Sequence, residues 1–242
     1  MKGHCIITCT PIRSEMSDRS EMISQLLYGE IFEIIESHQN WTKIKCEDDY
    51  VGWIDSRVIE IQSKKSKKAQ NKCFVNKIFS EITTPHGNII ATYGAELNAD
   101  EDEFSIHDFC FSETKDTSYL IADAQAFINT PYLWGGKSSY GLDCSGLIQT
   151  VAKVNGYMMP RDAYQQASIG QNIDFVRRQA GDLAYFKNNS GKIVHVGILS
   201  SEDKIIHASG WVREDEFNKT GIFDAKENKS SHNFSHLMRI FN

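Results

Sequence analysis

The spacing of the apolar residues changes at Gly181-Asp182, and this change constrains the fold of the C-terminal half most strongly. Before it, apolar residues recur at helical spacing after Cys144, and the run stops at Asn155-Gly156, a typical helix-ending pair. After it come short strand-type segments separated by polar turns, at residues 183–186, 193–199, 204–208 and 237–241. Helices followed by an antiparallel sheet predict an α+β fold.

The N-terminal half is rich in short strand-type segments, at residues 31–36, 41–46 and 50–54, which predict a small β-barrel. A cationic run, Lys64–Lys68, predicts a solvated linker. The following region repeats the pattern of the first loosely, because Tyr93-Gly94 echoes Tyr28-Gly29. We therefore expect two small barrels, at residues 1–62 and 63–114, before a larger domain at residues 115–242.

Charge and hydropathy exclude several classes of protein. The 242 residues carry a formal net charge of −6, so a nucleic-acid partner is not expected. No apolar run is long enough for a transmembrane helix or a signal peptide, which favours the cytoplasm, or the periplasm or exterior if a leader has been removed. The six cysteines are scattered, which is typical of reduced thiols, and we expect neither a metal nor another cofactor.

Cys144 is the candidate nucleophile. It lies at the start of the predicted helix, where unpaired backbone N–H groups and the helix dipole favour a thiolate and could hold an oxyanion. A lone cysteine before an apolar helix is nevertheless more often a small core residue. The assignment therefore depends on partners elsewhere in the chain.

Two histidines supply such partners. His195 lies in a strand that is apolar on both faces, and His207 lies in the next strand across a short turn, so their rings can be neighbours on one sheet face. The three residues fit a nucleophile, a general base and an orienting group: Cys144 attacks, His195 carries the proton, and His207 fixes the tautomer of His195. Satisfied core histidines are the alternative reading, since sequence gives order and not distance.

The C-terminal half resembles NlpC-type cell-wall cysteine peptidases from about residue 117 onward. The residues that carry the resemblance occur in order: Pro131–Gly136, Gly141–Leu147, Pro160-Arg161-Asp162, Ala180–Leu183, His195–Ile198 and His207–Gly210. The N-terminal half resembles the bacterial SH3-like barrels fused to such domains, and Cys46–Trp53 is similar to the barrel end that reaches the active site.

The resemblance implies a papain-like core, an α+β peptidase domain after two SH3-like barrels. It also implies hydrolysis of the γ-D-glutamyl–L-diamino acid bond of peptidoglycan stem peptides, with L-lysine or diaminopimelate as the diamino acid. Stems with a free N-terminal L-alanine would be preferred, as in the recycling of murein peptides. An acidic pocket suits such an amine, because a buried carboxylate pairs with it and rejects blocked peptides.

Individual roles also follow from the resemblance. Tyr50 and Asp143 would engage the substrate amine, Trp134 would line the pocket, and Tyr132 would help hold the oxyanion. Ser145, Arg161 and Asp162 would contribute to the substrate groove. An acidic barrel residue would add to the amine site, with Glu30 chosen and Glu15 and Glu21 as alternatives.

Two readings from other classes remain open. The first is a murein-binding module without catalysis, although binding alone needs no Cys144, His195 and His207 together. The second is a thiol acyltransferase on the same core, which would also work through an acyl-enzyme.

Overall fold

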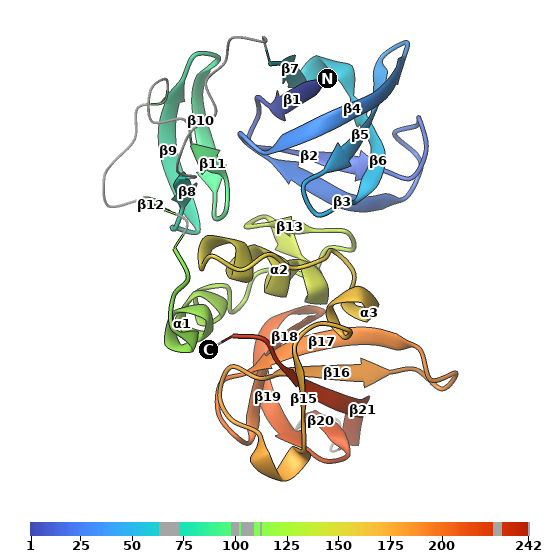
Figure 1. Ribbon diagram of the computed structural model, residues 1–242, viewed down its shortest axis with the longest axis vertical. Coiled ribbons are helices and arrows are strands. Elements are labelled where there is room, and N and C mark those ends of the chain that lie inside the picture. The colour runs from blue at the N-terminus through green and yellow to red at the C-terminus, as the bar shows by residue number, and fades with distance from the viewer. Residues whose placement is uncertain (63–72, 98–101, 103–108, 112, 225–228, 242) are drawn as a thin grey trace. The chain divides into compact units, whose positions relative to one another are not determined.

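The computed structural model describes residues 1–62, 73–97, 102, 109–111, 113–224 and 229–241. The chain divides into two compact units, whose elements are labelled in Figure 1. The first unit comprises Met1–Glu113 and Trp134–Tyr140, and the second comprises Thr114–Leu133 and Gly141–Asn242. The predicted linker, Lys64–Lys68, lies outside the described residues.

The first unit begins with a seven-stranded antiparallel sheet in the order β3-β2-β6-β5-β4-β1-β7 (Figure 1). Alternating residues face inward, and the core consists of Cys5, Ile12, Leu26, Phe32, Ile44 and Ile54. The predicted strands at residues 31–36, 41–46 and 50–54 are confirmed within one or two residues. The bounds are Lys2–Cys5 (β1), Cys9–Arg13 (β2), Met22–Leu27 (β3), Ile31–His38 (β4), Trp41–Cys46 (β5), Val51–Asp55 (β6) and Ile59–Ile61 (β7), with a 3₁₀ turn at Ser56–Val58.

The next described residues form two small antiparallel sheets, β10-β9 and β11-β8-β12, where a second barrel was predicted. Leu27 and Tyr28 of the first sheet complete their apolar core, and the Glu96 N–H donates to the Tyr28 carbonyl. This core is separate from that of the first sheet, and the two sheets are not shown to close into the predicted second barrel. The strands are Cys73–Val75 (β8), Phe79–Thr84 (β9), Gly87–Thr92 (β10), Glu96–Leu97 (β11) and Phe109–Phe111 (β12).

The segment Trp134–Tyr140 is held in the first unit by short contacts. Gly135 has φ +75° and passes so close to Met22 that an added Cβ would lie 2.4 Å from the Met22 carbonyl oxygen, so only glycine fits. The Lys137 N–H donates to the Gln25 side chain at 2.9 Å, and Lys137 Nζ forms a largely buried ion pair with Glu30 at 2.8 Å. Its one strand is Lys137–Ser138 (β13).

The second unit contains an antiparallel sheet in the order β15-β21-β16-β17-β18-β19-β20. Strand β20 also pairs with β21, so the strands from β16 to β21 close into a barrel (Figure 1). The bounds are Gly141–Leu142 (β14), Gln171–Ile173 (β15), Leu183–Lys187 (β16), Ile193–Leu199 (β17), Lys204–Ser209 (β18), Trp211–Asn218 (β19), Gly221–Asp224 (β20) and Lys229–Arg239 (β21), with a 3₁₀ turn at Phe175–Arg177.

The prediction for this unit was partly right. The strands at residues 183–186, 193–199 and 204–208 are confirmed, but strands β19 and β20 and most of β21 were not anticipated. The predicted antiparallel sheet is therefore closed into a barrel, and its core contains Phe186, Phe217 and Leu237.

Three helices of the second unit are Thr117–Ala126 (α1), Cys144–Val154 (α2) and Ala163–Gln166 (α3). Helix α2 is buried on nearly all sides, since it packs against α1 and also against β17 and β18. Its end agrees with the prediction, because Asn155 caps it and Gly156 follows with φ +83°. None of the helices in the described part of the chain is long and apolar enough to span a membrane.

Candidate active site

Cys144 is the first residue of α2, as predicted. Asp143 precedes it in extended conformation and caps the helix, because its Oδ1 accepts the Gly146 N–H at 2.7 Å. Cys144 is only 7% exposed, and backbone hydrogen bonds from Ser145 and Val196 lower the pKa of its thiol. Because Val196 follows His195 in β17, the packing of α2 against β17 brings the nucleophile to the strand that carries the base.

The Asp143 carboxylate is held by a buried network. Arg161, 1% exposed, donates Nη1 to Oδ1 at 3.0 Å and Nη2 to Oδ2 at 2.5 Å. Arg161 Nη1 also donates to Ser145 Oγ at 3.0 Å, and Gln166 Nε2 donates to the Ser145 carbonyl at 3.1 Å. Such a bidentate pair fixes geometry and charge together. Arg161 and Ser145, expected in the substrate groove, here support the turn that carries Cys144.

Opposing effects act on the pKa of the Cys144 thiol. Burial, and after it the charge of Asp143, raise this pKa to about 12, against the lowering effects of two backbone hydrogen bonds and of Arg161. The effect of burial exceeds that of the helix N-terminus. The predicted preference for a thiolate at the start of α2 stays a prediction, and burial of Cys144 opposes it.

His195 and His207 are neighbours, as predicted. His207 pairs with Gly197 on β17, two residues beyond His195, and the distance from His195 Nε2 to His207 Nδ1 is 2.9 Å. A Cβ at position 197 would lie 2.9 Å from His207 Cβ, so glycine permits this approach. Burial lowers the pKa of both imidazoles, which are therefore neutral near pH 7.

Asp215 extends this pair and was missed in the sequence. It lies on β19, and its Oδ2 is 2.9 Å from His207 Nε2 and 2.7 Å from Arg213 Nε. Burial raises the pKa of the Asp215 carboxyl, but hydrogen bonds and charge from His207 and Arg213 outweigh it and leave the pKa below its ordinary value. The alternation Arg213, Asp215 on a strand next to His207 could have indicated it, but β19 itself was not predicted.

The hydrogen-bond partners assign the tautomers of both histidines. The Asp215 carboxylate only accepts, so His207 carries its proton on Nε2 and accepts on Nδ1. His195 must then carry its proton on Nε2 and donate it to His207. The remaining nitrogen of His195, Nδ1, has a lone pair and can take a proton from a thiol.

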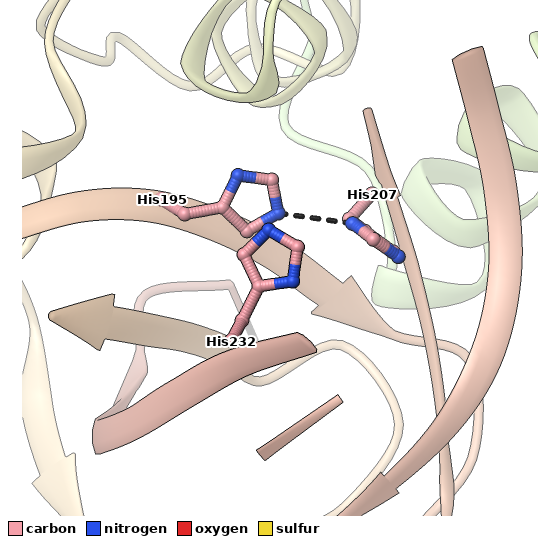
Figure 2. A group of neighbouring side chains, drawn as sticks. All are labelled: His195, His207 and His232. Carbon is pink, nitrogen blue, oxygen red and sulfur yellow. Dashed lines mark hydrogen bonds between the residues drawn. The ribbon is translucent and has the colours of Figure 1, made fainter. Parts of the chain in front are cut away.

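A third histidine, also missed, joins the cluster from β21. His232 stacks on His195 with 4.2 Å between ring centroids and 27° between planes, and Figure 2 shows the two rings as neighbours. Burial lowers the pKa of His232 to about 4. Closure of the barrel brings β21 to this place, and no local pattern in the sequence indicates that closure.

Tyr132 lies near the nucleophile. Its backbone N–H donates to the Gly210 carbonyl at 3.0 Å, and it forms a bridge with Leu142, just before Asp143. Burial raises the pKa of the Tyr132 phenol to about 12, and Cys144 and Asp143 also raise it. The phenol is therefore protonated and able to donate a hydrogen bond.

Asp162 precedes the short helix α3. Its backbone N–H donates to Gln165 Oε1 at 3.1 Å, and its carbonyl accepts the Gln165 N–H at 3.0 Å. The residue is partly buried, and its expected place in a substrate groove stays a prediction.

Three expected substrate residues belong to the first unit. Tyr50 lies in the turn between β5 and β6, and Trp134 is exposed and donates Nε1 to Glu21 Oε1 at 2.7 Å. Glu30 is 6% exposed and accepts from the Leu27 N–H at 2.8 Å besides Lys137. The Glu30 carboxylate thus has structural partners. Glu15 and Glu21 are exposed, and the roles of all these residues in amine binding stay predictions.

Two family models match the chain. Residues 129–226 match the NlpC/P60 family, and residues 12–59 match the bacterial dipeptidyl-peptidase SH3 domain. The NlpC/P60 match includes Cys144, His195, His207 and Asp215, whereas His232 lies beyond its end.

Named relatives agree with these matches. A gamma-D-glutamyl-L-lysine dipeptidyl-peptidase of Bacillus subtilis is 42% identical over 100 residues, covering 40% of this chain and 34% of the relative. A protein of the same name from Bacillus cereus is 23% identical over 235 residues, covering 80% of this chain and 69% of the relative. The chain thus spans about a third of the first relative's length and just over two thirds of the second's.

A solved structure has the same fold. The crystal structure of an NlpC/P60 family protein from Bacillus cereus covers 100% of both chains with a TM-score of 0.86 and 18% identity. At this identity the likeness concerns the fold, and it confirms the papain-like NlpC/P60 fold that the sequence motifs predict.

Proposed function

We propose that this chain is a cysteine peptidase of peptidoglycan peptides. Residues 129–226 are an NlpC/P60 domain, and the peptidases of that family are cysteine-type hydrolases. Residues 12–59 are a bacterial dipeptidyl-peptidase SH3 domain. One observation carries the proposal: the 2.9 Å hydrogen bond from His195 Nε2 to His207 Nδ1, in strands against which the Cys144 helix packs. If the two histidines served only to complete each other's hydrogen bonds in the core, no nucleophile would be needed at the start of the neighbouring helix.

The proposed reaction begins with both Cys144 and His195 neutral. The Cys144 sulfur attacks the carbonyl carbon of the scissile amide while His195 Nδ1 takes the thiol proton. His195, now charged, gives this proton to the leaving amine and a thioester remains. A water molecule, deprotonated by His195, then attacks the thioester, and the proton returns to Cys144.

The oxyanion of this reaction has donors close to the sulfur. Backbone hydrogen bonds from Ser145 and Val196 lower the pKa of Cys144, and the protonated Tyr132 phenol adds a third donor. Donors fixed before the reaction stabilise developing negative charge without reorganising. We assign the oxyanion to these groups.

The proposed substrate is a stem peptide cut between γ-D-glutamate and the L-diamino acid, with a free N-terminal L-alanine. Two of the relatives are named for the γ-D-glutamyl-L-lysine bond, which supports this choice. Selection for a free amine would direct the enzyme to released peptides, and so to their recycling in the cytoplasm, rather than to intact wall.

Incubation with L-Ala-γ-D-Glu-L-Lys tests the function directly, with free lysine followed by mass spectrometry. We expect lysine release without any added acceptor, which separates hydrolysis from acyl transfer and from binding alone. If the folded protein releases no lysine, the proposed peptidase function is wrong.

Blocking the amine of the same peptide tests the substrate preference. Acetylation of the alanine is expected to lower kcat/KM by about 10²-fold or more, because a buried polar partner is left unpaired. Equal cleavage of acetylated and free peptides would contradict the amine preference while leaving the peptidase activity intact.

Asp215→Ala tests the assigned tautomers. Without the carboxylate, His207 no longer has to carry its proton on Nε2, and we expect kcat to fall about 10- to 100-fold with little change in KM. Asp224→Ala is the matched control, because Asp224 also binds Arg213, at 3.2 Å, whereas His207 Nε2 has Asp215 as its partner at 2.9 Å. A similar fall of kcat in both variants would show that kcat depends on the position of Arg213 and not on the tautomer of His207.

A further inference from the structure

Three imidazole nitrogens converge beside the Cys144 helix. We propose that His195, His207 and His232 form a site for a transition-metal cation such as Zn²⁺, and that its occupation inhibits the enzyme. The three offer ligand atoms that all lie within 4.8 Å of one another, and Figure 2 shows the rings facing one another. The inhibitory part of this inference rests on the proposed function, whereas the binding part does not.

A β-bulge sets the direction of His232. Register between β20 and β21 runs from Ile222–His232 to Phe223–Ser230, so Ser231 is an extra residue. The Ser231 hydroxyl donates to the Ile222 carbonyl at 3.3 Å, and its oxygen lies 2.8 Å from His232 Nδ1. Because the Ser231 hydroxyl proton is donated to Ile222, the Ser231 oxygen accepts a hydrogen bond from the Nδ1–H group of His232. His232 Nε2 therefore carries a lone pair, and Figure 2 shows this nitrogen near His195.

His207 is prepared in the same way. Asp215 holds the proton of His207 on Nε2, which leaves the lone pair of Nδ1 toward the cluster. Metal-binding histidines usually donate their other ring N–H to a carboxylate or another oxygen, and this outer partner fixes the tautomer. His207 with Asp215 and His232 with Ser231 both have this arrangement before any metal arrives.

The spacing suits a small cation after modest movement. Zinc–imidazole bonds of about 2.0–2.1 Å in a tetrahedron place ligand nitrogens about 3.4 Å apart. His195 Nε2 and His207 Nδ1 are 2.9 Å apart and must separate slightly. The ligand nitrogen of His232, which lies within 4.8 Å of the other two, must move toward them. Three imidazoles favour zinc, copper or nickel over calcium and magnesium. Since His232 is the partly exposed member, the cluster is reached from its side.

Binding would disable the base through its tautomer. In the resting protein His195 carries its proton on Nε2, and Nδ1 is the nitrogen that receives the thiol proton. A metal on Nε2 requires that proton to move to Nδ1 of the same ring, with no net change in charge. His195 then has no lone pair for Cys144, and His207 is held by the same ion.

The binding test uses Cys144→Ala protein, so that the active-site thiol cannot act as a ligand. Titration with Zn²⁺ alone is followed by calorimetry, and the ligand type is read from the absorption of a Co²⁺ sample. His232→Gln in this background is compared with His236→Gln, a histidine of the same strand that stacks on Tyr185. We expect one nitrogen-ligated site, weakened at least about tenfold by His232→Gln and unchanged by His236→Gln.

The outcomes are separable. Absence of a nitrogen-ligated site, or equal affinities in the two histidine variants, would overturn the metal site. Circular dichroism and a His232→Asn variant guard against misfolding as the cause of a loss. In the protein with Cys144 intact, Zn²⁺ should stop lysine release reversibly with a chelator, and His232→Gln should need at least about tenfold more Zn²⁺ for half-inhibition. Binding without inhibition would overturn the regulatory part alone, and absence of lysine release before zinc is added would count against the proposed function alone.

Discussion

Cys144→Ala is expected to lower turnover of L-Ala-γ-D-Glu-L-Lys by a factor on the order of 10⁶, to the limit of detection. The reason is that the thioester cannot form, and no neighbouring group replaces the sulfur. The measurement is the initial rate of lysine release, with the wild-type protein diluted to cover the same range. The methyl group of alanine fits the buried space at the start of α2, so the fold should remain.

Cys5→Ala is the matched control for this result. Cys5 is also a buried free thiol, but it lies in the core of the first sheet, and burial raises the pKa of its thiol to about 12 as well. Its loss should affect stability and leave turnover near the wild-type value. Turnover above about one per cent in Cys144→Ala would mean that another group is the nucleophile.

Arg161→Ala is expected to lower the free energy of unfolding of the second unit by about 3–5 kcal/mol. The substitution leaves the Asp143 carboxylate buried without its bidentate partner, and it also removes the hydrogen bond to Ser145 Oγ. Urea unfolding, followed by tryptophan fluorescence and circular dichroism, measures the loss.

Two further variants identify the cause. Asp143→Asn in the Arg161→Ala background should recover part of the loss, because asparagine still caps a helix but carries no charge to leave unpaired. Lys43→Ala removes the exposed pair with Glu36 and should change stability by only about 0.5 kcal/mol. If Arg161→Ala is no more destabilising than Lys43→Ala, the buried pair does not hold the turn.

Local pattern was enough to predict the elements that carry the chemistry. The helical spacing of apolar residues after Cys144, and the helix-ending pair Asn155-Gly156, predicted both ends of α2. A short turn between two strands was enough to place His195 beside His207. These inferences needed only neighbours along the chain. The family resemblance supplied the rest of the fold class.

The features that sequence missed depend on pairing over longer distances. Strand β19 carries four charged residues in succession, Arg213, Glu214, Asp215 and Glu216. Apolar and polar residues therefore do not alternate there as in a typical strand, and Asp215 was not recognised. His232 reaches the site only because β21 pairs with both β16 and β20. The effect of burial on the pKa of Cys144 depends on elements that pack around it, and the position of a residue in a helix does not reveal them.

The pairing of β20 with β21 has a consequence for the order of events during synthesis. Cys144, His195 and His207 leave the ribosome before residues 229–239, which complete the wall around the base. A nascent chain therefore holds its nucleophile and base without the enclosure that keeps both neutral. The wall around the base is therefore complete only when β21 has been made and paired.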